Sequence, residues 1–227
     1  MQTKRAVALA ITTLTTGFLA ACQTTTTTPP SATSPAPASP VAATPSPAAT
    51  TPAGGEGGLK IGSLLPSTGD LASIGQLMVA AVPMAVETAN KCGGVNGKPV
   101  TLVAEDDQTN PATGTTAMTK LAEVDKVAGV VGSFASSVSS AAVDIAVRNK
   151  VMLVSPGSTS PVFTERAKKG EFQGFWARTA PPDTYQAAAL ANLAKERGFK
   201  RVSTVVINND YGVGFEKAFV EAFEKLG

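Results

Sequence analysis

The stretch VAGVVGSFASSVSSAAVDIAVRNKVMLVS, residues 127–155, decides the fold class. It begins with an apolar run at residues 127–133, continues into a helix-like segment that extends to Asn149, and closes on a second apolar run at residues 151–155. A continuously apolar strand is typical of a parallel sheet that is covered on both faces. A strand, a helix and a second strand at this spacing therefore predict one right-handed βαβ unit.

The same alternation precedes this stretch. Strand-like runs and helix-like segments take turns along the chain, with strands at residues 59–66 and 99–106 and helices at residues 75–94 and 111–124. The order β-α-β-α-β-α-β predicts an α/β fold, in which a parallel, doubly wound sheet carries helices on both faces.

The segment after residue 161 is less regular. It predicts a basic loop and a short strand, and then a new α/β unit, with the loop at 164–172, the strand at 174–179, helices at 183–197 and 214–226, and a strand at 201–207 between them. One strand cannot form a sheet that is covered on both faces. We therefore expect a first unit at residues 59–179 and only the beginning of a second, incomplete unit at residues 180–227.

The N-terminal region reads as a targeting segment. Lys4 and Arg5 precede a mildly apolar run that closes on LAAC at residues 19–22, which predicts a lipoprotein signal peptide with Cys22 as the lipidated residue. An ordinary secretory leader is the alternative, because threonines dilute the run. Residues 23–58 contain almost only Thr, Pro, Ala, Ser and Gly, which predicts a disordered tether behind a membrane anchor. We expect no later segment to reach the uninterrupted apolar length of a spanning helix.

The composition excludes several classes of function. Of the 19 basic residues, Lys4 and Arg5 lie in the leader, so the rest of the chain has 17 basic and 17 acidic residues. A protein without net positive charge is unlike one that binds nucleic acid. The chain has no histidine, which excludes Ser-His-Asp and Cys-His catalysis and the common zinc sites. Nothing indicates a cofactor, since Lys217 stands where a dinucleotide turn needs its third glycine. Cys92 is expected to be a buried small residue or to have a partner elsewhere.

Hydroxyl side chains follow two neighbouring strands. Ser136 and Ser137 stand at the start of the helix in the opening stretch, and Ser158 and Thr159 follow the next strand. The carboxyl ends of parallel strands meet at one edge of the sheet, where ligands bind. One serine can cap the helix while the other, with free N–H groups, faces an anion. Uncharged donors and carbonyls suit a zwitterion, although the serines could also merely cap and pack.

Several motifs carry a resemblance to a known family. They occur in the family's order and spacing: LKIGSLLPSTGDLASIGQ, NKCGGVNGKPVTLVAEDDQTNP, GVVGSFASS, VMLVSPGSTSP, FWARTAPPD and NNDYGVGF. The chain from Leu59 to Gly227 thereby resembles the leucine/isoleucine/valine-binding family of solute-binding proteins of ABC transporters, which have the type I periplasmic binding protein fold. The resemblance implies two lobes that close on an amino acid, an extracytoplasmic monomer, and ABC permease and ATPase subunits as partners.

The resemblance also implies a ligand site. Ser136 would hold the α-carboxylate, Gly157 would offer its carbonyl to the α-ammonium, and Thr159 would touch both groups. Asp183 could meet the ammonium or could merely cap its helix. The full set of expected ligand-binding residues is Ser136, Ser137, Gly157, Ser158, Thr159, Asp183 and Tyr211, of which the last closes over the ligand from the second lobe. Ile74 stands where branched-chain binders often carry a tyrosine, so the amino acid is not specified.

Two other functions compete with amino-acid import. The same fold could bind amides or other small polar solutes and signal to a receptor. A serine hydrolase of the envelope is disfavoured, because the serine-rich turns have no histidine and no Ser-x-x-Lys arrangement to activate a nucleophile. We therefore expect a binding protein rather than an enzyme.

Overall fold

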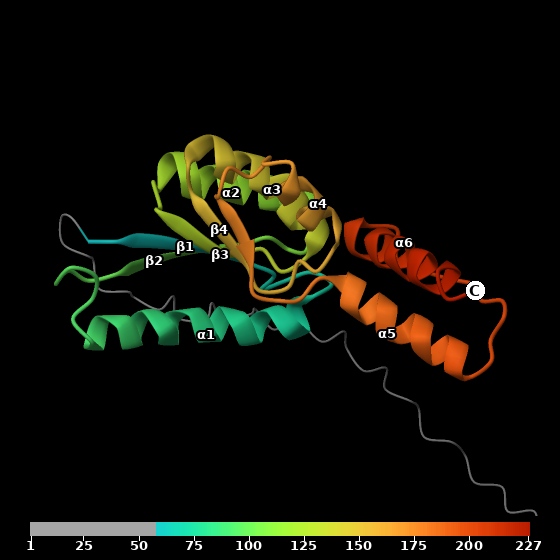
Figure 1. The fold of residues 1–227 in the computed structure, drawn as a ribbon. Coiled ribbons are helices and arrows are strands. Elements are labelled where there is room, and N and C mark those ends of the chain that lie inside the picture. The colour runs from blue at the N-terminus through green and yellow to red at the C-terminus, as the bar shows by residue number, and fades with distance from the viewer. Residues whose placement is uncertain (1–57) are drawn as a thin grey trace, which may run out of the picture. The chain divides into compact units, whose positions relative to one another are not determined.

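A computed structural model describes residues 58–227, so the predicted leader, the lipidation site Cys22 and all of the tether up to residue 57 lie outside the described residues. Five parallel strands form one sheet (Figure 1). Their order is β2-β1-β3-β4-β5, with β1 at Lys60–Leu65, β2 at Thr101–Asp106, β3 at Gly129–Gly132, β4 at Met152–Ser155 and β5 at Trp176–Arg178. The predicted parallel α/β fold is confirmed.

Helices lie on both faces of this sheet. Figure 1 shows α1 (Ala72–Lys91) on one face, and α2 (Pro111–Thr119) and α3 (Ser136–Asn149) together on the other. The side chain of Asn110 caps α2 by accepting from the amides of Ala112 and Thr113, and Pro111 occupies the first helical position, which needs no N–H donor. The helix continues into a π-helical turn, η1, at Lys120–Val124.

The core fills the space between the sheet and the helices α2 and α3 that cover one of its faces. Its fully buried side chains include Leu64, Met118, Leu121, Val143, Leu153 and Phe163. Phe163 stacks on Trp176 with 4.5 Å between ring centroids, and Phe172 closes the aromatic cluster at 5.2 Å from Trp176. Trp176 is therefore partly buried and packs against the core.

The predicted basic loop at residues 164–172 is wrong over its first half, because Val162–Lys168 forms a short helix, α4. Phe163 supplies the apolar anchor of this helix, since it is fully buried against the aromatic cluster. The charged side chains point away from the core, and Arg166 pairs with Asp144 at 2.6 Å and with Glu171 at 2.6 Å. One buried aromatic residue in a charged segment is too weak a periodic signal to predict a helix.

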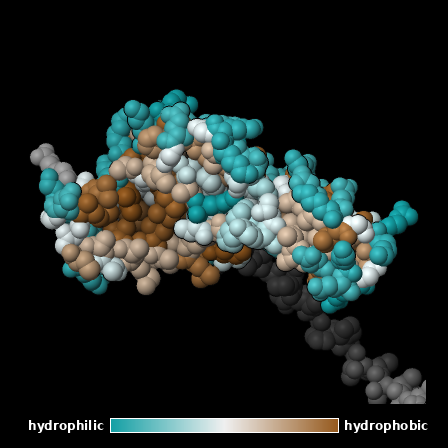
Figure 2. Space-filling model, in the orientation of Figure 1, coloured by the Kyte–Doolittle hydropathy of each residue, from teal (hydrophilic) through white to brown (hydrophobic). Residues whose placement is uncertain are grey.

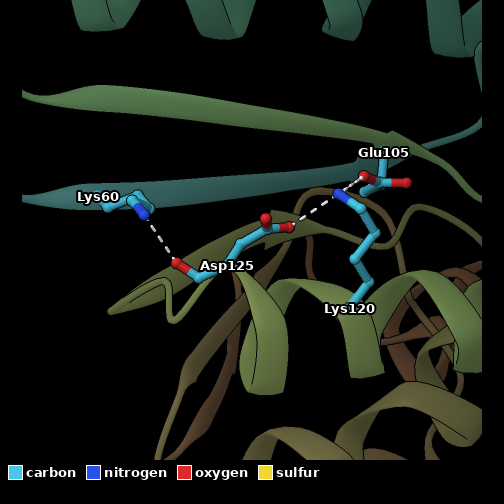
Figure 3. Close-up of polar contacts among 4 residues, drawn as sticks. All are labelled: Lys60, Glu105, Lys120 and Asp125. Atoms are coloured by element: carbon cyan, nitrogen blue, oxygen red, sulfur yellow. Dashed lines mark hydrogen bonds and ion pairs between the residues drawn. The ribbon is translucent and has the colours of Figure 1, made fainter. Parts of the chain in front are cut away.

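A polar network joins the π-helical turn to the edge of the sheet (Figure 3). The Nζ atom of Lys120 lies 2.6 Å from an oxygen of Glu105 on β2 and 2.9 Å from an oxygen of Asp125. Lys60 on β1 donates to the backbone carbonyl of Asp125 at 2.9 Å. Because these side chains are partly exposed, the network contributes modestly to stability and chiefly fixes how η1 joins the sheet.

Helix α1 has more apolar character than the sequence analysis allowed for. By length and composition it could cross a membrane, since its 20 residues include a window of mean hydropathy 1.3. In the structure it packs along the sheet and buries Val82 and Val86. Beside it, an apolar groove of about 460 Å³ runs between the helix and strands β1 and β3, and Figure 2 shows apolar surface there in brown.

Two further helices, α5 (Asp183–Glu196) and α6 (Asp210–Glu224), pack on each other through Ala187, Ala191 and Phe219. Asn209 caps α6, because its side chain accepts from the Gly212 amide at 2.9 Å, and the helix starts four residues before the predicted position. The strand expected at residues 201–207 is absent from the described structure. This segment has no neighbouring strand to pair with, and the side chain of Val205 is fully exposed. The division at residue 180 stays a prediction.

Cys92 is exposed, so the prediction of a buried thiol is wrong. It occupies the C-cap position of α1, beyond Val86, which is the last buried residue of that helix. The chain then leaves the helix through Gly93 and Gly94, both of which have positive φ. A residue at this point no longer shares the buried face of the helix.

Candidate functional site

Two turns lie side by side at the carboxyl ends of β3 and β4. The first leads from β3 into α3, which begins at Ser136. The second, residues 156–161, follows β4 and is called the β4 loop below. The backbone amide of Ser160 in the β4 loop donates to the Ser136 hydroxyl at 3.3 Å, so the two turns are in direct contact. Ser136 itself is 2% exposed.

Four buried serine hydroxyls join these two turns. They lie beneath the rim, the name used below for the edge that the two turns form. Ser155 donates to the Ser133 carbonyl at 2.5 Å, and Ser158 donates to the Ser139 hydroxyl at 2.7 Å. The Ser155 hydroxyl in turn accepts from the amide of Ser158 at 2.9 Å. All four side chains are fully buried, so the hydroxyl of Ser158, like its amide, bonds within the protein and is not available to a ligand. The sequence could not distinguish these inward hydroxyls from those that face the rim.

The start of α3 differs from the prediction that a serine would cap it. The N-cap residue is Ala135, and no side chain caps the helix, because Ser136 and Ser137 already occupy the first two helical positions. Within residues 58–227, neither side chain bonds to the first-turn amides. An uncapped helix N-terminus keeps N–H groups for a ligand anion, and the partly exposed Ser137 lies beside them.

The β4 loop is shaped by a glycine that touches an aromatic ring. A Cβ atom at Gly157 would lie 2.3 Å from two ring atoms of Phe134, so only glycine fits there without displacing the ring. Within residues 58–227, the Gly157 carbonyl accepts no hydrogen bond. The Thr159 carbonyl accepts from the Asp183 amide at 2.9 Å and connects the loop to α5.

Asp183 has a buried carboxyl group whose hydrogen-bonding capacity is only partly used within the described residues. It is 3% exposed, and one of its two carboxyl oxygens has no hydrogen-bond partner among the described residues. Burial raises the pKa of Asp183, while Thr159 and the positive charge of Arg178 oppose this effect. The alternative that Asp183 caps α5 does not hold, because the N-cap is Pro182 and Asp183 already lies within the helix. A cationic donor from a ligand would satisfy the free oxygen.

Tyr211 lies apart from these groups. It belongs to the first turn of α6, where its ring is 38% exposed and stacks on Phe215 at 6.2 Å. It makes no hydrogen bond to the other candidate residues in the described part of the chain. A groove of about 850 Å³ runs between the β4 loop and α6, and its lining includes Ser160, Asn209, Asp210 and Gly214.

Two carboxylates at the end of β2 act as turn residues. Asp106 accepts from the amides of Ser67 and Gln108 at 3.0 and 2.9 Å and thereby ties the turn after β1 to the turn after β2. Asp107 is fully buried; one oxygen accepts from the Thr109 amide at 2.8 Å, and the other has no partner in the described structure. Within residues 58–227, no three acidic, histidine or cysteine side chains gather as a metal site.

The buried Asp107 predicts a pH dependence of stability. Burial raises its pKa to about 6, so between about pH 4 and pH 6 the folded state binds more protons here than the unfolded state does. The contribution of Asp107 to the free energy of unfolding should therefore fall by about 2 kcal/mol as the pH rises through 6. Urea unfolding of wild type and Asp107→Asn from pH 4.5 to 7.5 measures this, and the variant should gain relative to wild type as the pH rises.

Asp106→Asn is the matched control for this prediction. Burial pulls the pKa of Asp106 upward, but its hydrogen bonds from Thr68, Gln108 and Ser67 prevail and lower the pKa. At a pH above the pKa that Asp106 has in the unfolded chain, the ionised Asp106 therefore stabilises the folded state. This contribution is lost only as the pH falls through the lower pKa of Asp106 in the folded state. A constant difference between Asp107→Asn and wild type across the pH range would contradict the prediction.

Comparison with known proteins finds similar sequences and structures over most of the described residues. A family model described as periplasmic binding protein matches residues 58–227. The chemotactic signal transduction system substrate-binding protein BasB of Halobacterium salinarum is 34% identical over 150 residues, covering 65% of this chain and 36% of that protein. Leu/Ile/Val-binding protein homolog 3 of Brucella melitensis is 32% identical over 170 residues, covering 74% of this chain and 45% of that protein.

Solved structures are similar over the same region. The leucine-binding protein LivK of Thermotoga maritima is 32% identical with a TM-score of 0.64, covering 74% of this chain and 46% of that one. The ABC transporter substrate-binding protein of Desulfitobacterium hafniense in complex with Leu is 28% identical with a TM-score of 0.60, covering 74% and 48%. The chain thus spans less than half the length of these relatives.

Proposed function

The chain belongs to the periplasmic binding protein family, and from this premise we propose that it is a lipid-anchored, extracytoplasmic substrate-binding protein that delivers a neutral amino acid to an ABC permease. In this proposal Cys22 carries the lipid and residues 23–58 are the tether, both as expected from the sequence. Two lobes close on the ligand about the segment near residues 179–182, and the permease recognises the closed form.

The observation that carries the proposal is the charge pattern at the rim formed by the two turns. The uncapped start of α3 offers N–H groups and the Ser136 hydroxyl to a carboxylate. The Gly157 carbonyl, the Thr159 hydroxyl and the free oxygen of Asp183 are acceptors for an ammonium group. An α-amino acid carries both groups on one carbon atom, so it matches a rim that offers anion-binding donors and ammonium-binding acceptors close together.

The names of similar proteins support the same ligand class. A relative is named for leucine, isoleucine and valine, and a similar solved structure holds Leu. Ile74, at the start of α1, is 47% exposed and could contact an apolar side chain of the ligand. Because the family resemblance places a tyrosine at this position in many branched-chain binders, the proposal extends to neutral amino acids in general.

Sensing is the second candidate function, because one relative is a chemotactic signal transduction protein. A sensing protein would use the same site for an amino acid, an amide or another small polar solute and would present the closed lobes to a receptor. Affinity capture with the ligand-saturated protein separates the two functions. Recovery of a permease supports import, whereas recovery of a receptor without a permease supports sensing.

Binding itself is tested with the full-length protein carrying Cys22→Ser, which removes the lipidation site. We expect at least one neutral amino acid to raise the melting temperature, because a ligand at 100 times its Kd adds about 2.7 kcal/mol to the free energy of unfolding. Calorimetry then gives the Kd. Benzoate and acetamide serve as ligands with a single charge and with none. A shift with benzoate but with no amino acid would contradict the proposal.

A further inference from the structure

Arg178 stands behind the β4 loop, at a position that the sequence analysis did not single out. It is the last residue of β5, pairs in register with Ser155 of β4, and is partly buried. We propose that Arg178 is the positioning residue of the ligand site: its guanidinium group holds the β4 loop in the conformation that binds the ligand. This inference rests on the proposed function of the same site.

The guanidinium group bridges three points of the chain. One terminal nitrogen donates to the carbonyls of Ser158 and Ser160, at 3.0 and 2.9 Å. The other donates to the Thr164 hydroxyl on α4 at 2.6 Å. These bonds attach the loop on both sides of Thr159 to β5 and α4. Hydrogen bonds from a charged donor are the stronger kind, so few contacts suffice to fix the loop.

Holding the Ser158 carbonyl also orients the next amide. In a trans peptide the C=O and the following N–H point in opposite directions. Because the Ser158 carbonyl points at Arg178, the Thr159 N–H points away from it. Within residues 58–227 this N–H has no acceptor, and it is therefore free to bind a ligand carboxylate.

An arginine is suited to this position for two physical reasons. Its planar fork donates in several fixed directions, whereas a lysine ammonium is a point charge without this geometry. Its plane also lies near the Trp176 ring, 5.6 Å from the ring centroid, which limits its movement. The positive charge of Arg178 opposes the rise of the pKa of Asp183, so the two opposite charges offset each other beneath a zwitterion.

Hydrogen exchange in the full chain tests the inference without a ligand. The reporters are the amides of Ser158, Ser160 and Asp183, which donate to Ser155, Ser136 and Thr159 respectively. In Arg178→Met these amides should exchange at least about tenfold faster, because the loop loses bonds to a charged donor. Arg166→Met is the matched control: Arg166 is also partly buried and pairs with Asp144 and Glu171, yet within residues 58–227 its side chain makes no hydrogen bond to the β4 loop.

Arg178→Lys separates the effect of the guanidinium hydrogen-bond geometry from the effect of the positive charge. This variant keeps a positive charge near Asp183 but cannot reproduce the fork, so its reporter amides should also exchange faster, and its Kd for an amino acid should rise about tenfold. If Arg178→Met does not fold, the lysine variant alone decides. Unchanged exchange of the three amides in Arg178→Lys overturns the inference. If wild type binds no amino acid, the proposed function fails, while the exchange result still decides the role of Arg178.

Discussion

Replacing Ser136 by alanine should weaken amino-acid binding by about 1.5 to 3 kcal/mol, which is roughly a 10- to 150-fold increase in Kd. The reason is that Ser136 occupies the first helical position of α3, where its hydroxyl lies beside the uncapped N–H groups. A hydroxyl that donates to a ligand carboxylate makes a hydrogen bond to a charged group, which is worth more than a bond between neutral groups.

The fold should survive this change. Among the described residues, the Ser136 hydroxyl accepts one long hydrogen bond, 3.3 Å from the Ser160 amide, while the four buried hydroxyls beneath it continue to join the two turns. Urea unfolding should therefore show a loss of no more than about 1 kcal/mol. Ser140→Ala, four residues further along the same helix, is the matched control and should bind like wild type. Equal Kd values for Ser136→Ala and wild type would remove Ser136 from the site.

The fold of the first unit was readable from the sequence because its strands are short, apolar and separated by helices. The strand predicted at residues 151–155 and the helix predicted to end at Asn149 differ from β4 and α3 by at most one residue. The errors arose where local pattern and packing disagree. Helix α4 depends on the single buried Phe163, and residues 201–207 have strand-like composition but no strand to pair with.

The site was predictable only in outline. Two hydroxyl-rich turns after neighbouring parallel strands must meet at one edge, and the contact between Ser160 and Ser136 reflects this. The direction of each hydroxyl is not written in the sequence, so Ser158 was expected at the rim although it bonds to Ser139 in the interior. Arg178 was missed because two of its three partners are backbone carbonyls, which leave no residue-type signal.

A rim that recognises a zwitterion requires a ligand that carries both charges of an amino acid. A ligand without a carboxylate would leave the N–H donors of α3 and the Thr159 amide unpaired. A ligand without an ammonium group would leave the Asp183 oxygen unpaired. A site built for hydrogen bonds strongly rejects an analogue that lacks one of the bonding groups, because buried polar groups then stay unpaired.

The decisive measurement of zwitterion recognition is a calorimetric titration. It compares the amino acid that binds best with its amide and with its N-acetyl derivative. The amide keeps only the ammonium charge, and the N-acetyl derivative keeps only the carboxylate charge. We predict that each derivative binds at least about 100-fold more weakly than the parent amino acid, which corresponds to about 2.7 kcal/mol. A derivative that binds as tightly as the parent would contradict recognition of a zwitterion at this rim.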